Sequence, residues 1–140
     1  MLEFVKAGLG EIIYWWYHMS RNIGIAAAQM ASIPHKAEAT LDKIDSLVEQ
    51  SNWYLPWVDM FCFPELILDG LSAFVPGGKV SEGQSIPGPI SDHLCNLAAR
   101  FHKWMVPGSM SERDGNDVYN TAIAISPFGE IVAHYRKIFP

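Results

Sequence analysis

The stretch FCFPELILDG, residues 61–70, closes an apolar run and starts a turn at a single proline. The largely apolar run Val58–Phe63 is typical of a strand inside an α/β sheet. Pro64 has no backbone N–H to donate to a neighbouring strand, so we expect the strand to end there. Glu65 follows at once, which predicts a carboxylate held at the end of a strand and not on a free loop.

The residues before this strand predict a further strand and a helix. The run NIGIAAAQM, Asn22–Met30, is continuously apolar, which indicates a strand covered on both faces. Between Lys36 and Asn52 the apolar residues recur at helical spacing, which predicts an amphipathic helix. The apolar stripe of this helix consists of Leu41, Ile44, Leu47 and Val48.

The residues after this strand predict a long loop and a second helix. Asp69–Gly88 is rich in Gly, Pro and Ser, and we expect this loop to border a binding pocket. The following segment, Pro89–Trp104, places apolar residues on one helical face and has a proline near its first turn. That face carries Ile90, Leu94, Leu97, Ala98 and Phe101.

The last third of the chain is rich in β-forming residues. We expect a short strand in WMVPGS, residues 104–109. The runs VYNTAIAIS, residues 118–126, and EIVAHYRKI, residues 130–138, are joined by PFG, which predicts a β-hairpin. The order strand, helix, strand, loop, helix, strand and hairpin predicts an α/β fold with parallel pairing and helices on a face of the sheet.

Composition excludes several classes of protein. The chain has 140 residues, 49% of them hydrophobic, and a formal net charge of −5, which indicates a globular domain. No basic stripe is present, so we expect no nucleic-acid partner, and the acidic balance argues against anionic membranes. Two cysteines, Cys62 and Cys95, are too few for a disulfide-stapled secreted scaffold, which favours a cytoplasmic protein.

The first residues are apolar and aromatic but do not fit a membrane span or a signal peptide. The segment EIIYWWYHM, residues 11–19, is apolar but shorter than the ~20 residues that span a bilayer, and it lacks a signal-peptide cleavage site. We expect residues 1–18 to be an extension outside the fold and residues 19–140 to form the domain. An interfacial anchor is the alternative, because Trp and Tyr favour the headgroup region.

Common catalytic and cofactor motifs are absent from the sequence. There is no phosphate loop, no G-x-G-x-x-G after a strand, no G-x-S-x-G and no zinc-ligand spacing of His or Cys. Two charged side chains remain, Glu65 and Lys137, each at the end of a predicted strand. A carboxylate and an ammonium at one sheet edge can act as proton acceptor and oxyanion donor. Two unrelated, solvated strand ends are the alternative on spacing alone.

Several motifs together resemble one enzyme family. The segments IGIAAAQM, DMFCFPELILDGL and PGSMSERDGNDVYNTAIAISPFGEIVAHYRKIFP are similar to the front part of the nitrilase superfamily, the carbon–nitrogen hydrolases. The match runs from about Ile23 to the last residue. Within it, FPE, YNTAI, SPFGE and YRKIFP come in the order of the family.

This resemblance implies a fold and an activity. The fold would be the N-terminal part of an αββα four-layer sandwich, incomplete in these residues. The activity would be hydrolysis of small amides or nitriles by a Glu-Lys-Cys triad without a cofactor. Glu65 matches the general base and Lys137 matches the lysine that stabilises the tetrahedral intermediate. The nucleophilic cysteine would follow residue 140, and Cys62 and Cys95 are interpreted as core residues.

The resemblance also leaves alternatives open. The motif YRKIFP favours an amidase, while a nitrilase or an N-carbamoyl amide hydrolase of the same family is the nearest alternative. A non-catalytic interaction module and a membrane-associated acyltransferase are alternatives of other classes. The family implies self-association into homo-oligomers, and we expect the 140 residues alone to be inactive and poorly soluble.

Overall fold

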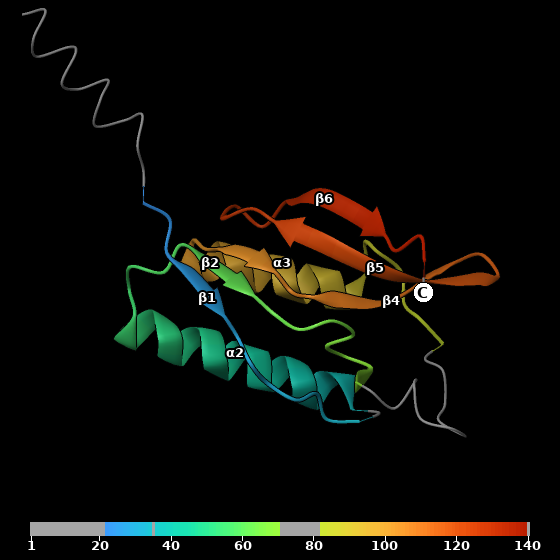
Figure 1. Cartoon of the computed structure of the whole chain (residues 1–140), viewed down its shortest axis with the longest axis horizontal. Helices are drawn as coiled ribbons and strands as arrows, with labels where there is room; N and C mark the ends of the chain where they lie inside the picture. Colours follow the sequence, from blue (N-terminus) through green and yellow to red (C-terminus); the bar gives the residue numbers. More distant parts are fainter. Residues whose placement is uncertain (1–21, 35, 71–81, 140) are drawn as a thin grey trace, which may run out of the picture.

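The computed structural model describes residues 22–34, 36–70 and 82–139. The expectations for residues 1–18 and for most of the loop Asp69–Gly88 therefore lie outside the described residues. Two helices and six strands are present in the described part, and Figure 1 labels them. They are β1 (Ile25–Ala27), α2 (Ala37–Tyr54), β2 (Met60–Cys62), α3 (Pro89–Phe101), β3 (Trp104–Val106), β4 (Ser109–Asp114), β5 (Asp117–Ile125) and β6 (Ile131–Arg136).

The strands form one mixed sheet in the order β1-β2-β3-β5-β4, with β6 pairing β5 on its other side. The pairs β1–β2 and β2–β3 are parallel, as the alternation of strands and helices predicted. The pairs β3–β5, β4–β5 and β5–β6 are antiparallel. The predicted hairpin is therefore confirmed as β5–β6, and both predicted helices are confirmed near their expected bounds.

The sequence prediction missed strand β4. We expected one short strand in residues 104–109, but β3 ends at Val106 and β4 continues from Ser109 to Asp114. Beyond Met110, the β4 sequence is polar and shows no apolar alternation, and it carries Glu and Asp, which are depleted in strands. Its ladder with β5, from Ser109 opposite Ala122 to Asp114 opposite Asp117, holds it in the sheet.

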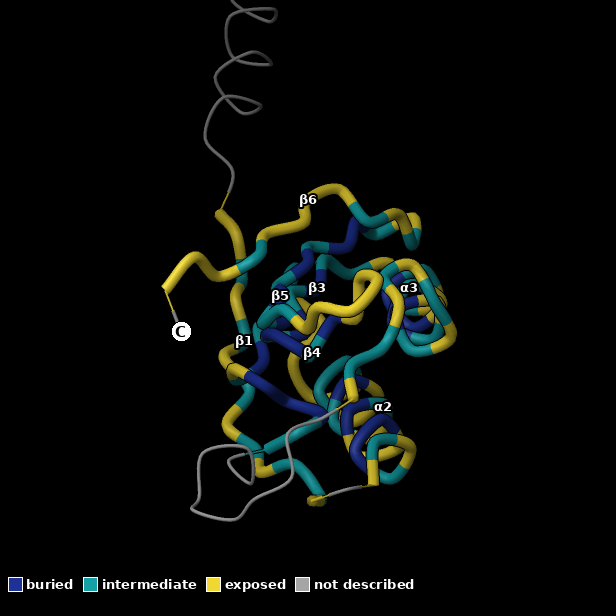
Figure 2. Tube along the Cα trace, turned by 90° about the vertical axis from the view of Figure 1, so that its right-hand side faces the viewer, coloured by how far each residue is buried: buried dark blue, intermediate teal, exposed yellow. Residues whose placement is uncertain are grey.

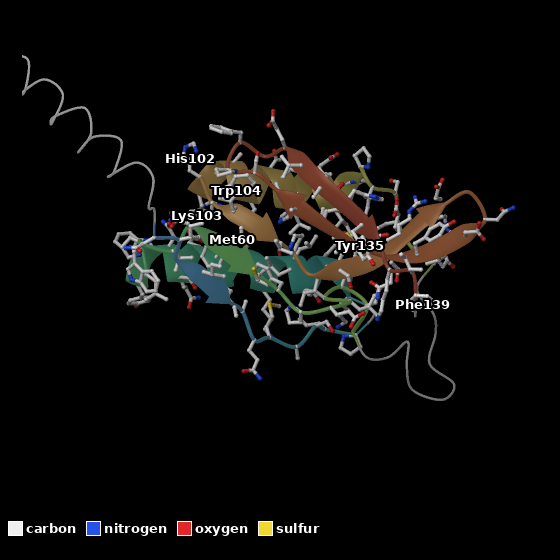
Figure 3. All side chains as sticks on the ribbon, turned by 45° about the horizontal axis from the view of Figure 1, so that its top comes forward. Met60, His102, Lys103, Trp104, Tyr135 and Phe139 are labelled. Carbon is white, nitrogen blue, oxygen red and sulfur yellow. The ribbon has the colours of Figure 1, made fainter. Side chains whose placement is uncertain are left out.

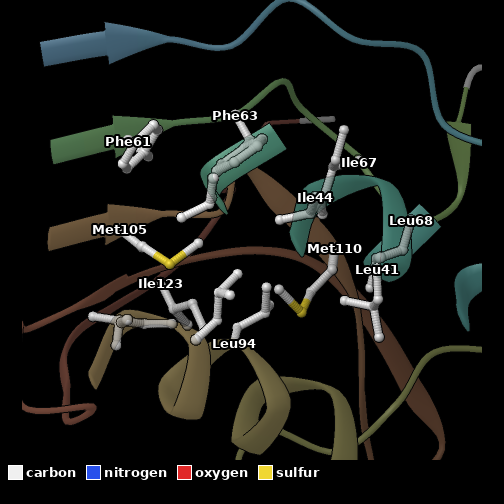
Figure 4. Close-up of a cluster of buried hydrophobic side chains, with 14 of the residues drawn as sticks. Leu41, Ile44, Phe61, Phe63, Ile67, Leu68, Leu94, Met105, Met110 and Ile123 are labelled. Atoms are coloured by element: carbon white, nitrogen blue, oxygen red, sulfur yellow. The ribbon is translucent and has the colours of Figure 1, made fainter. Parts of the chain in front are cut away.

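Both helices lie on the same face of the sheet (Figures 1 and 2). The hydrophobic core fills the space between the sheet and the helices. Figure 4 shows Phe61 of β2, Met105 of β3 and Ile123 of β5 directed at side chains of the helices. These three side chains are at most 2% exposed. The helices contribute Ile44 and Leu94, both fully buried, so the predicted apolar stripes do face the core.

The opposite face of the sheet is apolar but open. Because side chains alternate along a strand, the neighbours of the buried residues point away from the helices. Ile25, Met60 and Trp104 lie in register on this face, and Figure 3 shows Met60 and Trp104 on adjoining strands. Ile25 is 58% exposed. The expectation that the first strand is covered on both faces is therefore wrong for the described residues, which supply helices on one side only.

Strand β6 contains an irregularity near its start. Ala124 pairs with Ala133, but the next residue of β5, Ile125, pairs with Ile131. Val132 is thus an extra residue in β6, which makes the site a β-bulge. From Ala133 to Arg136 the register with β5 is regular, and it fixes which β6 side chains point to each face.

Candidate active site

Glu65 and Lys137 come together at one edge of the sheet. Glu65 follows β2, and Lys137 follows β6, 72 residues later in the chain. The Nζ atom of Lys137 donates to Oε1 of Glu65 at 2.9 Å. The two strand ends are therefore direct neighbours in space, and both side chains are partly exposed. The same oxygen also accepts a hydrogen bond from Nδ2 of Asn120, on β5, at 2.8 Å.

The turn that carries Glu65 is docked on the start of β4. The N–H of Leu66 donates to Oγ of Ser109 at 2.9 Å, and the N–H of Ile67 donates to the Ser109 carbonyl at 3.0 Å. Leu66 has a φ of 48°, which is unusual for a residue with a branched side chain. Gly108 has a φ of 73°, and a Cβ there would collide with the carbonyl oxygen of Pro64. Glycine is thus required for this close approach.

A pocket of about 570 Å³ opens beside the pair. Its described lining combines apolar and polar groups. They come from the turn after β2, from strands β3, β4, β5 and β6, and from the residue that follows β6. A volume of this size is typical of small-molecule sites. The lining residues are Glu65, Val106, Gly108, Ser109, Asn120, Ala122, Tyr135 and Lys137.

Hydrogen bonds, and not burial, determine the electrostatic state of Glu65. Burial would raise the pKa of its carboxyl group, but the side chain is 54% exposed. The hydrogen bonds from Lys137 and from Asn120 instead lower the pKa of Glu65 below its ordinary value. Glu65 is therefore a carboxylate at neutral pH, in the protonation state that a proton acceptor needs.

A second acidic residue, Glu112 on β4, forms a cluster that the sequence analysis did not find. Glu112 is 3% exposed and accepts a hydrogen bond from Oγ1 of Thr121 at 2.6 Å. Arg136 of β6 binds both of its carboxylate oxygens, at 2.8 and 2.9 Å, and Nε2 of His134 lies 3.1 Å from Oε2. The guanidinium group also lies 4.1 Å from the centre of the Tyr119 ring. Arg136, not Lys137, is thus the cation that faces the helix side.

These partners lower the pKa of Glu112 from 4.5 to about 2, chiefly through the hydrogen bonds from Arg136. Burial acts in the opposite direction and is outweighed. The cluster lies on the helix-covered face, away from the lining of the pocket at Glu65. It satisfies a buried charge within the sheet, and we assign it a structural role.

Neither cysteine of the chain lines this pocket. Cys95 packs against the core from α3, as expected, and burial followed by the charge of Asp92 raises the pKa of its thiol. Cys62 is not a core residue, contrary to expectation, because its place in β2 between Ala27 and Val106 directs it to the open face. A raised thiol pKa disfavours the nucleophilic thiolate form of Cys95.

In the part of the chain that the structure describes, no group of three or more His, Cys, Asp or Glu residues is placed to hold a metal ion. Within the same ranges, neither helix is long and apolar enough to cross a membrane.

Comparison with known sequences identifies the family. The family model for carbon-nitrogen hydrolases matches residues 24–139. A probable nitrilase of Schizosaccharomyces pombe is 30% identical over 116 residues, which cover 81% of this chain and 42% of that protein. A bifunctional nitrilase/nitrile hydratase of Lupinus angustifolius is 26% identical, over 89% of this chain and 39% of that protein. The chain thus spans about two fifths of the length of these curated relatives.

Solved structures share the fold. A carbon-nitrogen hydrolase from Helicobacter pylori G27 superposes with a TM-score of 0.73 and 20% identity, over 84% of this chain and 40% of that chain. Saccharomyces cerevisiae Nit3, a member of branch 10 of the nitrilase superfamily, gives 0.70 and 24%, over 86% and 45%. The sheet and two helices described above are accordingly part of the αββα sandwich, as the sequence predicted. The chain belongs to the carbon-nitrogen hydrolase family, within the nitrilase superfamily.

Proposed function

We propose that this chain provides two members of a Glu-Lys-Cys triad that hydrolyses non-peptide carbon–nitrogen bonds in small amides. Glu65 acts as the general base, and Lys137 stabilises the oxyanion of the tetrahedral intermediate. The observation that carries this proposal is the 2.9 Å contact between Lys137 Nζ and Glu65 Oε1 beside a pocket of about 570 Å³. Two oppositely charged groups at such a pocket fit acid–base catalysis of acyl transfer.

The reaction also needs a nucleophile, and neither Cys62 nor Cys95 lines the pocket. We therefore propose that a cysteine outside these 140 residues supplies it. Glu65 takes the thiol proton while sulfur bonds to the amide carbon, and Lys137 faces the oxygen that becomes negative. Ammonia leaves with a proton returned by Glu65. Water then attacks the thioester, Glu65 takes a proton from it, and the thiol is restored as the acid departs.

The open face of the sheet supports the same proposal. Ile25, Met60 and Trp104 form an apolar surface that the rest of an αββα sandwich would cover. Without that cover, we expect the 140 residues alone to be inactive and poorly soluble. No metal or organic cofactor takes part in the proposed reaction. Self-association into a homo-oligomer remains a proposal drawn from the family, and a cytoplasmic location remains a proposal drawn from the low number of cysteines.

The test is ammonia release from small amides by the complete catalytic domain that contains this sequence. Glu65→Gln and Lys137→Met should each lower kcat by at least ~10²-fold, because each removes a group that acts on the reacting atoms. Glu49→Gln is the matched control, since Glu49 is another exposed glutamate paired with a cation, Arg100. Retained activity in both site variants would contradict the proposal, and activity of the isolated 140 residues would contradict the external nucleophile.

A nitrile is the second candidate substrate. Both curated relatives cited above have names that describe nitrilases, although the motif YRKIFP favours an amidase. A thiolate adds to a nitrile carbon as it does to an amide carbon, giving a thioimidate. Parallel assays of ammonia release from an amide and a nitrile with the same side chain distinguish these two candidate substrates. An N-carbamoyl derivative in the same assay tests the third candidate, an N-carbamoyl amide hydrolase.

A further inference from the structure

Asn120 contacts both members of the candidate catalytic pair. Its Nδ2 atom donates to Oε1 of Glu65 at 2.8 Å. Its backbone carbonyl accepts the N–H of Lys137 at 2.9 Å. One residue of β5 thus joins the turn after β2 to the residue after β6, which are distant in the sequence.

The orientation of the Asn120 amide is fixed by charge. If the amide were flipped, its oxygen would face a carboxylate oxygen of Glu65, and two acceptors would repel each other. With Nδ2 on Glu65, the other end of the amide, Oδ1, is buried and meets no donor among the described residues. A buried acceptor without a partner is a net cost to folding. In this orientation Oδ1 of Asn120 therefore makes no hydrogen bond, while Nδ2 donates to Glu65.

The two donors share one oxygen of Glu65. Nζ of Lys137 and Nδ2 of Asn120 both reach Oε1, and no hydrogen bond to Oε2 is found within the described ranges. A carboxylate anchored through one oxygen keeps the lone pairs of the other free to accept a proton. The two oxygens of Glu65 are thus not equivalent.

We propose that Asn120 is a positioning residue that anchors Oε1 of Glu65 beside Lys137 and leaves Oε2 as the proton-accepting atom. The assignment of Oε2 as the proton acceptor rests on the function proposed above, whereas the anchoring of Oε1 by Asn120 does not. Asn120 would touch neither the nucleophile nor the reacting carbon. It would act through Glu65, by limiting the rotation of a half-exposed side chain.

The surroundings of Glu65 make the effect of Asn120 on the pKa of Glu65 measurable. Among the described residues that line the pocket, Lys137 is the other charged group and Tyr135 is the other titratable one. Asn120→Leu removes one of the two hydrogen bonds that lower the pKa of Glu65, so this pKa should rise toward its ordinary value. The substitution also removes the unpartnered oxygen, and water can reach Glu65, so stability should not fall.

The experiment uses the complete catalytic domain that contains this sequence. The titration of Glu65 is followed by carbon NMR of its carboxyl group, assigned with Glu65→Gln, and kcat and KM are measured against pH. In Asn120→Leu we expect a higher pKa of Glu65, and therefore a shift of the acidic limb of the kcat–pH profile to higher pH. We also expect kcat to fall by about 10-fold while KM stays unchanged. Asn96→Leu, at an exposed site on α3, is the control and should change none of these.

Asn120→Asp is a second variant, in case the leucine variant does not fold. It places a second carboxylate against Glu65 and should raise the Glu65 pKa further. If both variants leave the titration and the pH profile unchanged while Glu65→Gln is inactive, the inference is overturned and the proposed function stands. If Glu65→Gln is fully active, the proposed function fails, and the titration alone decides whether Asn120 holds Glu65.

Discussion

Arg136 and Lys137 are neighbours in the sequence, yet each pairs with a glutamate on a different face of the sheet. Arg136 binds Glu112, which is buried and has donors on both of its oxygens. Lys137 binds Glu65, which is exposed to a pocket and is held through one oxygen. The difference separates two uses of the same charge pair. A carboxylate with every acceptor site filled stabilises the fold, whereas one with a free oxygen is available for chemistry.

The largest expected effect comes from breaking the buried pair. Glu112→Ala leaves Arg136, His134 and Thr121 without their shared acceptor, and we expect a loss of about 3 kcal/mol in the free energy of unfolding. Glu65→Ala, the matched change at the exposed pair, should cost less than about 1 kcal/mol. Urea unfolding measures both. Equal losses at the two sites would contradict the division into a structural and a functional pair.

A smaller effect is expected at the glycine that supports the exposed pair. Gly108→Ala should cost about 2 kcal/mol, because the new Cβ collides with the Pro64 carbonyl and the backbone has a positive φ. Gly115→Ala is the control, since Gly115 also has a positive φ, of 60°, but open space around it. That change should cost about 1 kcal/mol. Thermal or urea unfolding checks the difference, and equal costs would show that the close approach at Pro64 is unimportant.

The buried pair also makes stability depend on pH. The pKa of Glu112 is about 2 in the folded chain against an ordinary 4.5. A lowered folded pKa adds stability that is complete above pH 4.5 and is lost as the pH falls toward 2. The stability difference between wild type and Glu112→Gln should therefore shrink over this window. Urea midpoints at several pH values measure it, and a difference that is constant with pH would contradict the assigned cause.

Much of the fold and both candidate residues could be predicted from local patterns. The apolar run that Pro64 closes and the helical spacing of Ile44 and Leu94 depend on neighbours in the sequence, so they are readable without a structure. The placement of Glu65 and Lys137 at strand ends follows from the same patterns. Their convergence followed from the family resemblance, and the 2.9 Å contact agrees with it.

The parts that could not be predicted depend on cross-strand partners. Glu112 lies in a polar segment that resembles a loop, and only the approach of Arg136 from β6 makes its burial possible. Asn120 was visible within the motif YNTAI, but the direction of its amide depends on a carboxylate 55 residues away. The exposure of Glu65 also depends on contacts distant in the sequence, because the described residues supply helices on one face of the sheet only.

The bulge at Val132 decides which of the two cations reaches which glutamate. In a strand, a shift of one residue turns every later side chain to the other face. If β6 kept the register of Ile131 with Ile125 to its end, Arg136 would lie opposite Asn120 and point to the pocket, and Lys137 would point toward the helices. The accommodation of Val132 as a bulge thus determines which face of the sheet each later side chain of β6 occupies. Deletion of Val132 would remove the bulge and leave Ala133 opposite Ala124, so the guanidinium would stay in the interior and the ammonium on the substrate side.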